Sequence, residues 1–98
     1  MIVVSNATPL IRLAKIHSIN LLQELFGTLI IPPAVYREVV TQAPNHPGAA
    51  EIRQVDWIQV QALADHSKVD YLRADLDWGE AEALVLAEEI SGGLGSGR

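Results

Sequence analysis

Three short apolar runs predict β-strands, and helical patterns fill the segments between them. The runs cover residues 2–5, 28–31 and 57–61. The first two are continuous, as expected of strands buried on both faces, whereas the third alternates and is expected near the edge of a sheet. Helices between successive strands predict a parallel sheet with right-handed crossovers. We therefore expect an α/β fold.

The first two helices have recognisable starts and stops. Thr8 is expected to cap the first helix, with Pro9 at its first position. Ser18 or Asn20 is expected to cap the second helix, and Gly27 to end it.

Further helices are expected after Pro32-Pro33, around residues 49–53, over 66–76 and over 77–90, with a loop at 41–48. Residues 91–98 are nearly all Gly and Ser, which predicts a flexible tail. The chain is thus expected to contain one domain over residues 1–90 and a tail over 91–98.

Composition narrows the classes of function. A chain of 98 residues with 49% hydrophobic content suits one compact domain with a small core. A net charge of −5 argues against a broad basic surface that wraps nucleic acid, but not against a local basic groove or a metal site. The absence of cysteine excludes disulfides, zinc thiolate sites and thiol catalysis. With no export signal or membrane span expected, we predict a cytoplasmic protein.

The candidate functional residues are polar side chains at predicted strand and helix ends. Asn6 follows the first strand, where parallel sheets place their ligands, although a turn residue bonded to nearby backbone would look the same. Thr8 could present its hydroxyl to the same space. Glu38 lies at the margin of an apolar helix face, where a surface ion pair with Arg37 or Arg12 is the alternative.

Glu80 has two interpretations. Asp77 and Glu80 have the spacing of a capping box at the start of the last helix. A helical wheel also places Glu80 between Leu84 and Ala87 on the face predicted to be buried. Because burying an unpaired carboxylate is costly, this position favours a Glu80 side chain that faces a cleft. The same wheel assigns Glu82 and Glu89 to the solvated face.

Three stretches of the sequence are informative mainly in combination. Their order along the chain and the spacing between them form a more specific pattern than any one stretch does. They are residues 2–11 (IVVSNATPLI), 31–39 (IPPAVYREV) and 76–83 (LDWGEAEA). Together they resemble the PIN domain family, in particular small prokaryotic PIN-like proteins related to type II toxin–antitoxin ribonucleases. The resemblance implies a three-layer α/β fold with a parallel sheet and flanking helices.

The resemblance also implies RNA hydrolysis by acidic residues that hold Mg²⁺ or Mn²⁺, since hard cations prefer oxygen ligands. Glu38 and Glu80 match the second and third acids of the family. Asn6 stands where the first is normally an aspartate, and Ala7 replaces a hydroxyl residue, which leaves Thr8 as the local hydroxyl for substrate binding. We assign catalysis and metal binding to Asn6, Glu38 and Glu80.

Two departures from the pattern of the PIN domain family predict weak or no nuclease activity. Asn6 removes one negative ligand, and Gly-Ser sequence stands where the family continues into a further strand with another acid. The C-terminal strand is therefore expected to be missing, which would expose the first strand as a sheet edge. We expect homodimerisation or another association through that edge, with RNA and an antitoxin as possible partners and no membrane. The alternatives are a non-catalytic interaction module or partner of an intact PIN-like protein, and a structural remnant.

Overall fold

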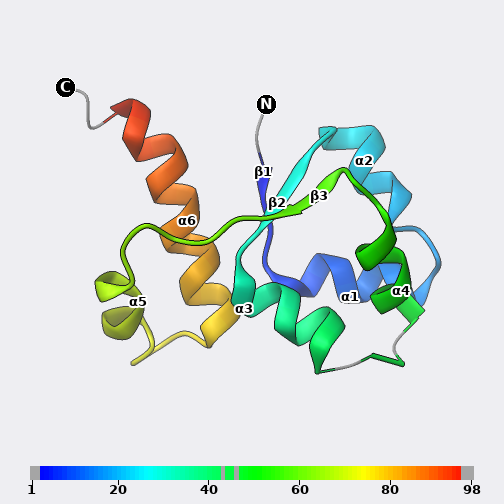
Figure 1. Cartoon of the computed structure of the whole chain (residues 1–98), viewed down its shortest axis with the longest axis horizontal. Helices are drawn as coiled ribbons and strands as arrows, with labels where there is room; N and C mark the ends of the chain where they lie inside the picture. Colours follow the sequence, from blue (N-terminus) through cyan, green and yellow to red (C-terminus); the bar gives the residue numbers. More distant parts are fainter. Residues whose placement is uncertain (1–2, 43, 46, 96–98) are drawn as a thin grey trace.

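A parallel sheet forms the centre of the molecule. The computed structural model describes residues 3–42, 44–45 and 47–95. Strands β1 (Val3–Val4), β2 (Leu29–Ile31) and β3 (Ile58–Val60) form a three-stranded sheet in the order β1-β2-β3, and both pairings are parallel (Figure 1). The parallel sheet and the edge position of the third strand were both predicted from the sequence.

Helices fill every connection, as the sequence predicted. In chain order they are α1 (Ala7–Lys15), α2 (Asn20–Phe26), α3 (Pro33–Tyr36) with its π-helical continuation η1 (Arg37–Thr41), α4 (Pro47–Gln54), α5 (Ser67–Leu72) and α6 (Trp78–Gly95). Proline is well suited to the first position of α3, because its missing N–H would have no intrahelical partner there.

Helices cover both faces of the sheet, because successive side chains of β2 point to opposite faces. Leu29 and Ile31 pack into a cluster with residues of α1, α2, η1 and α4. Ile30 packs into a second cluster with residues of α5 and α6, such as Val69 and Leu86. Figure 1 shows α5 and α6 on one side of the strands and α1, α2 and α4 on the other. The expected three-layer α/β fold is confirmed.

Three predicted helix ends differ in the structure. The N-cap of α1 is Asn6, not Thr8, since the Asn6 side chain accepts the hydrogen bond. Helix α2 has no side-chain cap, so neither Ser18 nor Asn20 has the predicted role, although it ends at Gly27 with φ 75° as expected. Helix α6 continues to Gly95, so residues 91–95 are helical where we predicted coil, and residues 96–98 lie outside the described residues.

Strand β1 is an edge of the sheet. Val3 aligns with Leu29 and Val4 with Ile30, and the N–H of Ser5 extends the pairing to Ile30 O at 3.0 Å. Within the described residues no strand lies on the other side of β1. Among the helices of the described residues, none is long and apolar enough to cross a membrane.

Candidate active site

Asn6 and Glu80 lie on the same hollow, at the carboxyl end of β1. The hollow has a volume of about 340 Å³, and its other walls are apolar: Val4, Leu76, Ala83, Leu84 and Ala87. Asn6 Oδ1 accepts a hydrogen bond of 3.2 Å from the N–H of Thr8, which caps α1. The structure therefore supports both interpretations of Asn6, since the side chain bonds nearby backbone and also lines a hollow with a carboxylate.

The capping box at the start of α6 is confirmed. Asp77 Oδ1 accepts a 2.7 Å hydrogen bond from the N–H of Glu80, and Glu80 Oε1 accepts a 3.2 Å bond from the N–H of Asp77. Glu80 is exposed, so its predicted place on the buried face of α6 was wrong. The box fixes the Glu80 carboxylate over the first helical turn and leaves it accessible to solvent.

Glu38 approaches the same turn from η1. It lines a second hollow of about 340 Å³ together with Asp77 and Gly79. An added Cβ on Gly79 would lie 3.2 Å from Glu38 Oε1, so the missing side chain at this position allows the close approach of the carboxylate. Partial burial raises the pKa of Glu38, and the negative charges of Asp77 and Glu80 raise it further.

The buried acid of α6 is Glu82, contrary to the prediction that it faces solvent. Only 3% of Glu82 is exposed. Its Oε1 accepts a 2.9 Å hydrogen bond from the N–H of Ala34, and its Oε2 lies 3.5 Å from Nε2 of His66. Glu89 is half-buried and accepts hydrogen bonds from the N–H groups of Ala64 and Asp65, so it too has a structural role.

Thr8 lies apart from the acids. Its side chain is exposed, and it lines a different hollow with Ile11, Arg12, Lys15 and Ile16, on the outer side of α1. The structure thus brings Asn6 together with Glu80, and Glu38 together with Asp77. Asp77 is the residue that sequence reasoning assigned only to a helix cap. Its position beside Glu38 depends on the tertiary packing of α3, which leads into η1, against α6, and no local sequence pattern records that packing.

Comparison with known families identifies the fold. A family model described as a PIN domain matches residues 2–94. The chain belongs to the PIN domain family. It has no significant match among curated proteins or solved structures. PIN domains in general are nucleases that depend on divalent metal ions.

The acidic residues of this PIN domain suit a hard cation in chemistry but are not gathered around one position. Glu38, Asp77, Glu80 and Asn6 offer carboxylate and amide oxygens, the ligands that Mg²⁺ and Mn²⁺ prefer. Within the described ranges, no group of three or more His, Asp or Glu side chains is arranged to hold a metal ion. Any ion would therefore have to draw these side chains together, at a cost in affinity.

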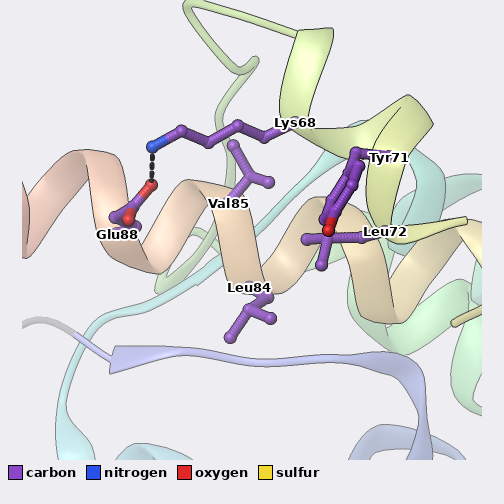
Figure 2. A pocket seen from close by; sticks show the side chains of 6 residues that line it. All are labelled: Lys68, Tyr71, Leu72, Leu84, Val85 and Glu88. Atoms are coloured by element: carbon purple, nitrogen blue, oxygen red, sulfur yellow. Dashed lines mark hydrogen bonds and ion pairs between the residues drawn. The ribbon is translucent and has the colours of Figure 1, made fainter. Parts of the chain in front are cut away.

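The PIN domain also has a groove between α5 and α6, which shares Leu84 with the hollow that contains Asn6 and Glu80. It is lined by Lys68, Tyr71, Leu72, Leu84, Val85 and Glu88 and has a volume of about 490 Å³. Figure 2 shows Lys68 and Glu88 joined at one end, where Nζ and Oε1 lie 2.6 Å apart, and Tyr71 over Leu72 at the other. Tyr71 is 83% exposed. The groove has no acidic cluster suited to hydrolysis.

Proposed function

We propose that this PIN domain is a metal-dependent ribonuclease whose activity is weak because Asn6 replaces a carboxylate. The observation that supports the proposal is the meeting of Glu38 with Asp77 and Gly79 at the first turn of α6, although the two segments are far apart in the sequence. Partial burial raises the pKa of Glu38, and repulsion from the carboxylates of Asp77 and Glu80 raises it further. A bound cation would relieve that repulsion.

Each residue has a distinct role in the proposed reaction. A divalent cation, when bound, supplies charge neutralisation at the phosphate and activation of water. Glu38 holds its carboxylate beside Gly79, and the capping box orients Glu80. Asn6 contributes an amide oxygen without charge. The site therefore attracts a cation less strongly than three carboxylates would.

Titration with Mn²⁺ tests the proposal. We expect saturable but weak binding to the full chain, and a loss of at least about tenfold in affinity in Glu38→Ala, because a carboxylate ligand is removed. Glu24→Ala is the matched control, since Glu24 is an exposed acid on α2 and outside both hollows. Equal Mn²⁺ affinity in both variants would contradict the proposal. Strong metal-dependent RNA cleavage that Glu80→Ala abolishes would contradict the proposed weakness.

A second candidate function is association between two copies through the edge of β1. It is favoured by one observation: β1 pairs only with β2 within the described residues. Free backbone donors and acceptors on an edge strand can pair with another strand. Sedimentation is expected to show a dimer at micromolar concentration, with slow amide exchange at Val3 and Val4. A monomer under these conditions would exclude this candidate.

A further inference from the structure

Trp78 is an exposed aromatic side chain beside the acidic residues. The chain has two tryptophans, of which Trp57 is 8% exposed and belongs to the core, whereas Trp78 is 49% exposed. Trp78 is the first residue of α6 and lines the hollow that contains Glu38. A large aromatic surface is thus open to solvent within the candidate active site.

Arg73 supports the ring of Trp78. The guanidinium carbon lies 4.0 Å from the centroid of the indole ring, a cation–π contact. Two of its nitrogens, Nε and Nη1, are enclosed and have no hydrogen-bond acceptor in the described part of the chain. The ring, and not an acid, therefore holds Arg73 in place. This contact restricts the Trp78 side chain before any ligand arrives, which lowers the entropic cost of binding.

Two arginines, Arg37 and Arg73, lie beside the ring, together with the carboxylates of Glu38 and Asp77. Arg37 is exposed and lines the same hollow as Trp78 and Glu38. Within residues 3–42, 44–45 and 47–95, neither Arg37 nor Arg73 lies within ion-pair distance of a carboxylate. Arg37 is therefore available to an anionic ligand that lies against the ring, whereas Arg73 is held against the ring itself.

We propose that Trp78, held by Arg73, is a stacking platform for one unpaired base of a single-stranded RNA, with Arg37 at the neighbouring phosphate. The inference rests on the proposed function and assigns the residues that hold the RNA at this site. Bases in a duplex are stacked on each other, so their faces are closed to a side chain, whereas single-stranded bases stack readily on aromatic rings.

The charge of the chain favours stacking over phosphate contacts as the main source of affinity. A net charge of −5 argues against a broad basic surface for the RNA backbone. Two arginines beside one ring can contact few phosphates. RNA affinity is therefore expected to depend only weakly on salt concentration and strongly on the ring.

Fluorescence anisotropy with a labelled single-stranded oligouridylate tests the platform, in EDTA so that no cleavage occurs. We expect Trp78→Ala to weaken binding by about tenfold or more and Trp78→Phe to restore much of the affinity. Tyr71→Ala is the matched control, because Tyr71 is also an exposed aromatic residue but lies in the groove between α5 and α6. Thermal melts monitored by circular dichroism check that the variants are folded.

An oligonucleotide with abasic positions separates stacking from charge. It keeps the phosphates but lacks the bases that would stack on Trp78. It should therefore bind the wild-type chain more weakly than the intact oligonucleotide does. Trp78→Ala should bind both oligonucleotides with similar affinity. No binding to the wild-type chain, or equal affinity of wild type and Trp78→Ala, would overturn the inference. Mn²⁺ titration of Trp78→Ala is expected to match wild type. Retained Mn²⁺ binding with no effect of Trp78 on RNA affinity would refute the platform and leave the proposed ribonuclease site intact.

Discussion

Glu82→Ala is expected to lower the free energy of unfolding by about 2–3 kcal/mol, because it leaves a buried backbone donor without an acceptor. The N–H of Ala34 lies at the start of α3, where the first N–H groups of a helix have no partner within the helix. Glu82 Oε1 supplies that partner at 2.9 Å. Since the side chain of His66 is 56% exposed, it can return to water and adds little to the loss.

Thermal unfolding of matched variants measures this effect. A loss of 2–3 kcal/mol corresponds to a fall in Tm of about 10 °C or more in a domain of this size. Glu82→Gln keeps an oxygen for Ala34, so its cost should stay below that of the alanine variant. Glu88→Ala is the control on the same helix, because Glu88 forms an exposed pair with Lys68 and should cost less than about 1 kcal/mol. Equal melting temperatures of Glu82→Ala and Glu88→Ala would contradict the prediction.

The contrast between Glu80 and Glu82 shows that the sequence did not predict which face of α6 is buried. Helix α6 has apolar residues on nearly all sides, so a helical wheel does not define one buried face. The wheel favoured the side of Leu84, which is 54% exposed, whereas the buried residues of the helix include Ala81, Glu82, Val85 and Leu86. The position of α5 and α3 against α6 decides the face, and no local pattern records it.

Some signals that act within a few residues were predicted correctly, although the caps predicted at Thr8 and at Ser18 or Asn20 were not. The capping box needs only Asp77 and Glu80, and the end of α2 needs only Gly27, so the sequence predicted both. The β-strands follow from short apolar runs in the same way. The proximity of Glu38 to Asp77 depends on how α3, which leads into η1, packs against α6. The family resemblance matched Glu38 and Glu80 to acids of the site and did not include Asp77.

Asn6→Asp is expected to strengthen Mn²⁺ binding by about tenfold or more, because it adds a negative oxygen ligand to the hollow that contains Glu80. The fold should tolerate the change. Asn6 caps α1 through Oδ1, and aspartate caps helices as well as asparagine does. A negative charge at a helix N-terminus is also favourable. A gain in metal affinity would therefore come without a loss of stability.

Calorimetric titration with Mn²⁺ and an RNA cleavage assay measure this gain together. Asn6→Asp should cleave single-stranded RNA faster than wild type in Mn²⁺, and adding Glu80→Ala should remove the gain, since the two side chains share one hollow. Asn20→Asp is the control, because it makes the same charge change at an exposed position on α2. If both aspartate variants bind Mn²⁺ equally, net charge alone explains the effect and Asn6 is not a ligand position. A specific gain would make residue 6 the position that limits the activity of this PIN domain.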